Sequence, residues 1–260
     1  MSGAIDIVDA TVIRGGREVL KGIRLRLGSG DHACILGPNG SGKSTIVKLI
    51  SGELSPLYRE PAAVRLFGEE RWELFALRDR LGIVSDSLQQ EQTREETVLV
   101  TILSGFFGGV GLPLRTEPSP AMLEKAQEVA ELLGLRPILD RKATEISSGQ
   151  MRRALVARAL VHEPEMLLLD EPYTSLDIAA RSYFRSCVSA LAARGHAIVL
   201  VTHELAEISP EIERVILIKE GRIFADGPKS RILRSETISE LFGLALRVDE
   251  EDGIYRARLT

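Results

Sequence analysis

Apolar residues along the chain alternate between short continuous runs and longer stretches in which they recur every three or four positions. Short runs bounded by glycine or polar residues predict buried strands, and the longer spacing predicts helices. The predicted strands cover residues 32–36, 64–67, 81–84, 166–169 and 197–201, and a hairpin is predicted from 215–218 and 222–225. One predicted helix starts with residues 45–50, and three more cover 120–133, 148–161 and 178–193. This alternation favours an α/β fold.

The segment from about 87 to 143 departs from the alternation. It holds few strand-like runs, and its clearest feature is the helical spacing of residues 120–133, which stops at Gly134. We therefore expect a helical lobe that is inserted into the α/β core.

The composition is that of a folded soluble protein. The 260 residues are 44% hydrophobic and 27% charged, which allows one large core, or a core with a smaller inserted lobe. The net charge of -4 argues against a nucleic-acid partner, because nucleic-acid-binding proteins present basic surfaces.

The N-terminus and the cysteines indicate a cytoplasmic protein. Met1 to Asp9 lack the basic and apolar regions of a secretory signal. Cys34 lies in a strand-like run and Cys187 in a helical pattern, and neither has the spacing of a metal site or a CxxC motif. We expect both to be buried or half-buried thiols.

One run without charged residues, from Val98 to Leu114, resembles a membrane span. It is at the short limit for crossing a hydrocarbon core of ~30 Å, and four glycines and one proline interrupt it. We reject the transmembrane interpretation. Two others stay open: ordinary core, or an apolar surface that docks on another protein.

A glycine-rich turn lies between the first predicted strand and the first predicted helix. It matches the pattern GxxxxGK[ST] with Gly37, Pro38, Asn39, Gly40, Ser41, Gly42, Lys43 and Ser44. Such glycines let backbone N–H groups converge on phosphate oxygens at a helix N-terminus. We expect Lys43 to reach the β- and γ-phosphates, Ser44 to bind Mg²⁺ and Thr45 to support the α-phosphate. The pattern predicts nucleotide binding.

Two carboxylates follow the apolar run 166–169. Asp170 stands at the C-terminal end of this predicted strand, where a carboxylate can hold the coordination shell of Mg²⁺. Glu171 is one residue further along and can polarise a water in line with the γ-phosphate, as a general base. Two acids after a strand are a weak pattern alone, since acids often cap exposed strand ends, but with the phosphate loop they predict hydrolysis.

A third motif identifies the type of P-loop protein. Residues 146–150 read Ile-Ser-Ser-Gly-Gln, and Ser147 with Gln150 forms a capping-box pattern that opens a helix. The stretch resembles the LSGGQ signature of ATP-binding cassette (ABC) ATPases, with Ile146 in place of Leu and Ser148 in place of the first Gly. Ser147 and Gly149, which approach phosphate in the family, are retained, and Gln150 completes the signature.

Further residues extend the resemblance over about 5–227. Ser175-Leu176-Asp177 resembles the family's D-loop, and His203 resembles the switch histidine that senses the γ-phosphate. The stretches 18–23 and 30–31 resemble the family's N-terminal β-subdomain. By this resemblance, the nucleotide-contacting set also includes Ser147, Gly149, Gln150 and Asp177, and Lys43, Glu171 and His203 are the catalytic residues.

The resemblance implies an α/β fold: a P-loop NTPase (RecA-like) core with an N-terminal antiparallel β-subdomain and an inserted α-helical subdomain. We expect one ABC ATPase domain over 1–260. Within it, the β-subdomain and P-loop part cover about 1–86, the helical subdomain about 87–150, the rest of the core about 151–227 and a short C-terminal extension about 228–260.

Two positions depart from the family in ways that concern the site. Asp86 stands where the family usually has a glutamine that contacts Mg²⁺ and links the site to the transporter. A carboxylate can still meet the metal but cannot donate a hydrogen bond, and Gln89 and Gln90 are nearby alternatives. Arg14 stands where the family tends to stack an aromatic ring on adenine, a contact that a guanidinium can also make.

The resemblance implies an ATPase subunit that uses ATP and Mg²⁺ and powers a separate membrane permease at the cytoplasmic face of the membrane. It also implies a head-to-tail, ATP-dependent dimer, either a homodimer or a heterodimer with a related ATPase. Residues 85–86 and 104–107 look most like molybdate- or metal-type importers. The alternatives are a soluble cassette ATPase of iron-sulfur assembly, repair or translation, and a P-loop kinase or GTP-binding switch, which the signature disfavours.

Overall fold

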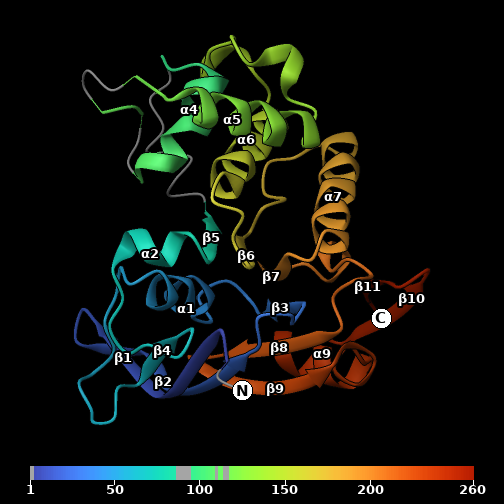
Figure 1. The fold of residues 1–260 in the computed structure, drawn as a ribbon. Coiled ribbons are helices and arrows are strands. Elements are labelled where there is room, and N and C mark those ends of the chain that lie inside the picture. The colour runs from blue at the N-terminus through green and yellow to red at the C-terminus, as the bar shows by residue number, and fades with distance from the viewer. Residues whose placement is uncertain (1–2, 86–94, 109–110, 114–116) are drawn as a thin grey trace. The chain divides into compact units, whose positions relative to one another are not determined.

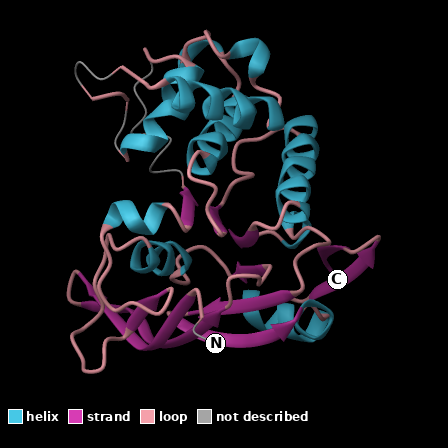
Figure 2. Ribbon diagram, viewed as in Figure 1, coloured by secondary structure: helices cyan, strands magenta, loops and turns pink. Residues whose placement is uncertain are grey.

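The computed structural model describes residues 3–85, 95–108, 111–113 and 117–260, without the side chains of Leu74 and Phe75. The chain divides into two compact units. The first unit joins Met1–Trp72 to Ala197–Thr260, and the second unit is Glu73–His196. Figure 1 shows the course of the chain and Figure 2 its helices and strands.

The first unit begins with an antiparallel sheet in the order β2-β1-β4, made of β1 (Ile5–Arg14), β2 (Arg17–Leu27) and β4 (Val64–Leu66). Gly15 and Gly16 have positive φ and close the hairpin between β1 and β2, as a tight turn requires. Isoleucine, valine and leucine side chains alternate into the interior, among them Ile5, Ile7 and Val12.

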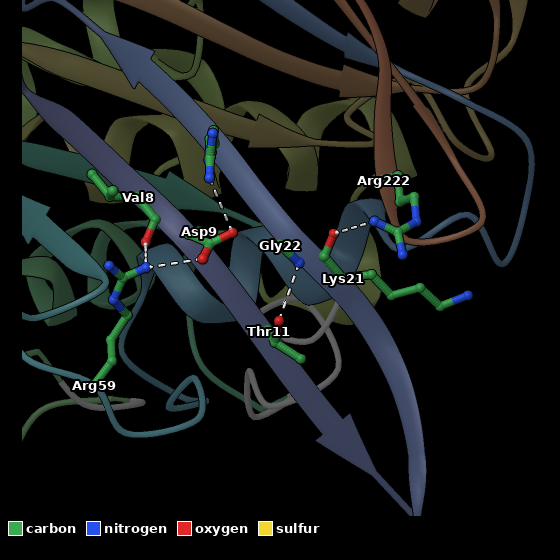
Figure 3. Close-up of polar contacts among 8 residues, drawn as sticks. Val8, Asp9, Thr11, Lys21, Gly22, Arg59 and Arg222 are labelled. Carbon is green, nitrogen blue, oxygen red and sulfur yellow. Dashed lines mark hydrogen bonds and ion pairs between the residues drawn. The ribbon is translucent and has the colours of Figure 1, made fainter.

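Charge pairs flank an irregularity in β1. The register of β1 against β2 shifts after Ile7, and Asp9 has a φ of 57°. The carboxylate of Asp9 lies 3.2 Å from Arg59 and 3.6 Å from Arg24, while Gly22 donates from its backbone nitrogen to the Thr11 hydroxyl (Figure 3). The contacts therefore lie beside a break in strand register of the kind that β-bulges produce.

The second sheet of the first unit places parallel strands side by side. It runs β7-β3-β8-β9, with β3 (Ala33–Leu36), β7 (Ala197–Thr202), β8 (Arg214–Lys219) and β9 (Arg222–Pro228). β3 pairs in parallel with β7 and β8, and β9 is antiparallel to β8. Every residue of β3 and β7 is buried, which is why they read as continuous apolar runs. Helix α1 (Lys43–Ile50) follows β3.

Four short elements end the first unit: α8 (Lys229–Ile232), α9 (Ser235–Phe242), β10 (Leu246–Glu251) and β11 (Ile254–Leu259). β10 and β11 form an antiparallel hairpin in full register. Ion pairs such as Arg258–Asp249, at 3.0 Å, join side chains of the two strands. The hairpin has no clean alternation of apolar and polar residues, so periodicity did not predict it.

The second unit combines a parallel strand pair with helices. Its elements are α2 (Leu74–Arg78), β5 (Leu81–Val84), α4 (Val98–Leu103), the 3₁₀ turns η1 (Ser104–Phe107), η2 (Arg136–Ile138) and η3 (Ala143–Glu145), α5 (Pro120–Leu132), α6 (Ser148–Leu160), β6 (Met166–Asp170) and α7 (Ile178–Ala193). β5 pairs in parallel with β6. The predicted helices and strands of this unit therefore form within a residue of their predicted bounds.

The charge-free run 98–114 begins as core. Val98, Ile102 and Leu103 are buried, and a Cβ on Gly105 would lie 2.2 Å from the backbone oxygen of Arg158. Among the described residues, no helix is both long and apolar enough to cross a bilayer. The run up to Gly105 is thus interior packing. Phe106 and Phe107 are half-buried, and residues 109–110 and 114 lie outside the described residues.

The two cysteines are buried free thiols, as predicted. Burial raises the pKa of the Cys34 thiol in β3, and the nearby Glu207 raises it further. Burial also raises the pKa of Cys187 in α7. A raised pKa keeps both thiols in the protonated form at neutral pH.

Candidate functional site

The glycine-rich turn of the first unit is a preformed loop between β3 and α1. A Cβ on Gly37 would lie 2.3 Å from the backbone oxygen of Ile218, so no other residue fits without moving that strand. Gly40 and Gly42 have φ values of 78° and 111°, which side-chain-bearing residues rarely adopt. The glycines of the motif thus meet specific steric demands of this loop.

Lys43 bends back over the loop. Its ammonium group donates to the backbone oxygens of Gly37 at 2.9 Å and Pro38 at 3.2 Å. Thr45 is buried, Ser44 is exposed in the first turn of α1, and the Ser41 hydroxyl oxygen is buried without a hydrogen-bond partner among the described residues. A cation, a helix N-terminus and an unpaired hydroxyl form a cradle suited to an anion such as phosphate.

His203 lies next to this loop within the first unit. Leu36 of β3 is paired with Thr202 of β7, so the two strands end at the same edge, and the backbone nitrogen of Gly37 donates to the oxygen of Thr202 at 3.4 Å. His203 follows directly and is half-buried, with its Nε2 3.9 Å from a carboxylate oxygen of Glu204. The structure therefore brings the predicted switch histidine and the phosphate loop to neighbouring strand ends.

Arg14 is the last residue of β1 and is exposed at the hairpin tip opposite Arg17. Its predicted contact with adenine stays a prediction.

The two predicted acidic residues lie in the second unit, at the end of β6. Residues 166–169 are buried, and Asp170 and Glu171 are half-buried where the strand ends. Glu171 has a φ of 47°, a conformation that is costly for a residue with a side chain and common at functional sites. Asp86, Gln89 and Gln90 lie outside the described residues.

The signature motif opens α6 as the capping-box pattern predicts. The hydroxyl of Ser147 accepts from the backbone nitrogen of Gln150 at 3.2 Å, and the Gln150 side-chain oxygen accepts from the backbone nitrogen of Ser147 at 2.8 Å. A Cβ on Gly149 would lie 2.9 Å from the Cβ of Ala180, so this glycine allows α6 to approach α7. Gly149 therefore has a packing role whether or not it also meets a phosphate.

Two features around the signature were not predicted. The Ser148 hydroxyl donates to the backbone oxygen of Ser175 at 3.0 Å, although Ser148 read as a departure from the family's motif. Arg153 donates to the backbone oxygen of Leu133 at 2.6 Å and lies over the ring of Tyr183 at 4.4 Å. It thereby connects α5, α6 and α7. Both contacts join segments distant in sequence, and no local pattern signals them.

Comparison with known proteins decides the family. A model of the ABC transporter family matches residues 20–174. The chain belongs to the ABC transporter family. It is 32% identical to the uncharacterized ABC transporter ATP-binding protein YlmA of Bacillus subtilis (strain 168), over 94% of this chain and 92% of that protein.

Other relatives have names that describe transport. The zinc transport system ATP-binding protein TroB of Treponema pallidum (strain Nichols) is 31% identical over 92% of this chain and 87% of its own. The Nod factor export ATP-binding protein I of Paraburkholderia xenovorans (strain LB400) is 33% identical over 88% of this chain and 73% of that protein. This ABC protein is therefore an ATP-binding subunit of the transporter type.

Solved ABC structures confirm the predicted fold class. A nucleotide-free ATP-binding cassette from an ABC transporter matches with a TM-score of 0.77 and 26% identity, over 93% of this chain and 95% of that one. The ADP conformation of another cassette matches with a TM-score of 0.76 and 25% identity, over 94% of this chain and 98% of that one. The chain is thus an ABC ATPase with a P-loop NTPase core, an antiparallel β-subdomain and a helical subdomain.

Proposed function

We propose that this ABC ATPase is the motor subunit of a transporter that moves metal ions through a separate permease, and that it acts at the cytoplasmic face of the membrane. The observation that carries the ATP-dependent part is the preformed phosphate loop, whose glycines have the required conformations and whose Lys43 ammonium already lies over the loop. TroB, whose name describes zinc transport, supports a metal cargo. The Nod factor export relatives favour the alternative of an exporter.

Each predicted site residue receives a role in this proposal. Lys43 and the backbone N–H groups of residues 37–45 bind the phosphates, and His203 senses the γ-phosphate. Glu171 polarises the attacking water as the general base. Arg14 stacks on the base. Ser147, Gly149, Gln150 and Asp177 act on nucleotide bound by a second copy.

Mg²⁺ fits the donors that the chain offers. The Ser44 hydroxyl is exposed and the Asp170 carboxylate is half-buried at a strand end, and oxygen donors of this kind are those that Mg²⁺ prefers. Mg²⁺ commonly takes few protein ligands and completes its shell with water and nucleotide phosphates. When bound, it would neutralise charge on the phosphates. Asp86 is a third proposed ligand on sequence grounds.

We expect a dimer that forms on ATP binding. The amide-rich N-terminus of α6, with Ser147 as its cap, is half of an anion site, and in this family it completes the site of another subunit. A Glu171→Gln variant that binds but does not consume ATP should therefore elute as a dimer with ATP and Mg²⁺ in size-exclusion chromatography. It should elute as a monomer with ADP. Sizing the purified single chain also separates a homodimer from an obligate heterodimer.

The matched control carries Ser147→Ala in the Glu171→Gln background. This change removes the cap hydroxyl and should weaken the dimer while leaving ATP binding by the phosphate loop intact. If Glu171→Gln stays monomeric with ATP at all protein concentrations, a homodimer is wrong for this chain, and a related ATPase becomes the expected partner.

We also propose that part of the run 98–114 binds the permease. The first half of the run is core, so we take the half-buried end of η1 as the candidate contact to test. Phe106 already stacks edge-on against His162 with ring centres 5.5 Å apart, which makes Phe107 the cleaner probe. Phe107→Asp should preserve basal ATPase activity and prevent co-purification with a permease that co-purifies with the unaltered chain.

Ile102→Asp is the contrasting variant, because Ile102 is fully buried and a charge there should prevent folding. If Phe107→Asp lowers solubility as Ile102→Asp does, residue 107 belongs to the core and the docking proposal fails. Retained co-purification of a folded Phe107→Asp variant would also count against it.

A further inference from the structure

We propose that Ser148 is a positioning residue for ATP hydrolysis, which holds the loop that carries Glu171 through a hydrogen bond to Ser175. This inference rests on the proposed role of Glu171. The Ser148 hydroxyl donates to the backbone oxygen of Ser175 at 3.0 Å, across 27 residues of sequence. The signature helix and the loop after β6 are thus joined within the second unit.

The loop from Glu171 to Asp177 needs such support because its backbone is strained. Glu171 and Ser175 have φ values of 47° and 64°, in the left-handed region that residues with side chains avoid. Two overlapping turns span 171–176, with the backbone nitrogen of Thr174 donating to the oxygen of Glu171 and that of Leu176 to the oxygen of Tyr173, each at 3.2 Å. A residue in this conformation persists when its surroundings fix it.

Side chains from two helices supply that fixation. Ser148 of α6 binds the carbonyl of Ser175, and Arg181 of α7 donates to the next carbonyl, that of Leu176, at 3.1 Å. Asp177 caps α7 by accepting from the backbone nitrogen of Ala180 at 2.7 Å. Consecutive carbonyls of the loop are therefore held from both sides, and Glu171 begins the segment that these contacts anchor.

Ser148 is suited to this task by its place in the helix. It is the first residue of α6, after the cap Ser147, so its side chain is free of the intrahelical packing of later turns. The hydrogen bond is exposed to solvent, so its loss should loosen the loop without unfolding the protein. The glycine usual at this position in the family has no hydroxyl, so this chain gains a link that the family's motif does not encode.

The decisive variant is Ser148→Ala. Alanine suits a first helical turn, so α6 should form as before, and only the hydroxyl is lost. We expect kcat for ATP hydrolysis to fall about two- to tenfold with an unchanged KM, because the loop is positioned less well while the phosphate loop is untouched. Ser148→Thr keeps a hydroxyl and should recover most of the kcat.

Hydrogen exchange tests the position of the loop without relying on activity. Peptides that include the amides of Thr174 and Leu176 should exchange faster in Ser148→Ala than in the unaltered protein, while peptides within β6 should not change. The matched control is Ser186→Ala, which removes another exposed serine hydroxyl that donates to a backbone oxygen, that of Ser182 at 3.3 Å in α7. It should change neither kcat nor loop exchange.

The outcomes separate this inference from the proposed function. Equal kcat and equal loop exchange in Ser148→Ala and the unaltered protein would overturn the positioning role, as would equal losses in Ser148→Ala and Ser148→Thr. If Glu171→Gln keeps full turnover, the proposed base is wrong, but faster exchange of the loop in Ser148→Ala would still establish the link between Ser148 and Ser175.

Discussion

Replacing Lys43 by alanine should weaken ATP binding about 10- to 150-fold, the loss expected when a charged hydrogen-bond donor to phosphate is removed. Replacing Glu171 by glutamine should leave ATP affinity nearly unchanged and lower kcat about 100-fold or more, because it removes a general base and not a phosphate contact. The two variants thus affect different steps. A fluorescent ATP analogue measures affinity, and release of phosphate measures turnover.

The contrast between the variants is the test. Equal loss of affinity in both would show that Glu171 binds nucleotide and that the base has been misassigned. Lys43→Arg keeps the charge but has a longer, forked head group, so it controls for charge alone. It should fold normally and bind ATP more weakly than the unaltered chain, since the loop holds the ammonium group of Lys43 between the carbonyls of Gly37 and Pro38.

Strands and helices with a buried face were predictable from the sequence. β5 and α7 form at their predicted bounds, because a continuous apolar run and a helical spacing each match one kind of burial. The hairpin of β10 and β11 escaped prediction, since charged side chains line both strands and obscure any alternation of apolar and polar residues. The helical character of the second unit followed from the absence of strand-like runs between 87 and 143.

The motifs of the site were predictable and their surroundings were not. The phosphate loop and the capping box depend on residues close in sequence, so their patterns are visible in the chain. The contact between Ser148 and Ser175 joins positions 27 residues apart, and neither residue carries a local signal for it. The same holds for Gly149, whose packing against Ala180 depends on how α6 and α7 approach each other. The structural role of Ser148, a departure from the family's signature, therefore became visible only in the structure.

The steric role of Gly37 leads to a second large effect. A methyl group at this position would meet the backbone oxygen of Ile218 at 2.3 Å and the Ser41 hydroxyl at 2.8 Å. Relief requires the phosphate loop or β8 to shift, because a backbone oxygen in a paired strand cannot turn away as a flexible side chain does. We expect Gly37→Ala to destabilise the fold by about 1–3 kcal/mol and to abolish measurable ATP binding.

Gly30→Ala is the matched control in the same unit. A Cβ on Gly30 meets nothing within 4 Å, and its φ does not require glycine, so alanine should be tolerated there. Thermal unfolding and ATP titration of the two variants should therefore diverge, with Gly30→Ala close to the unaltered chain. Normal ATP binding by Gly37→Ala would show that the loop can widen without cost. In that case the fixed approach of β8 would not be what shapes the phosphate cradle, and the affinity would depend on Lys43 and the helix N-terminus alone.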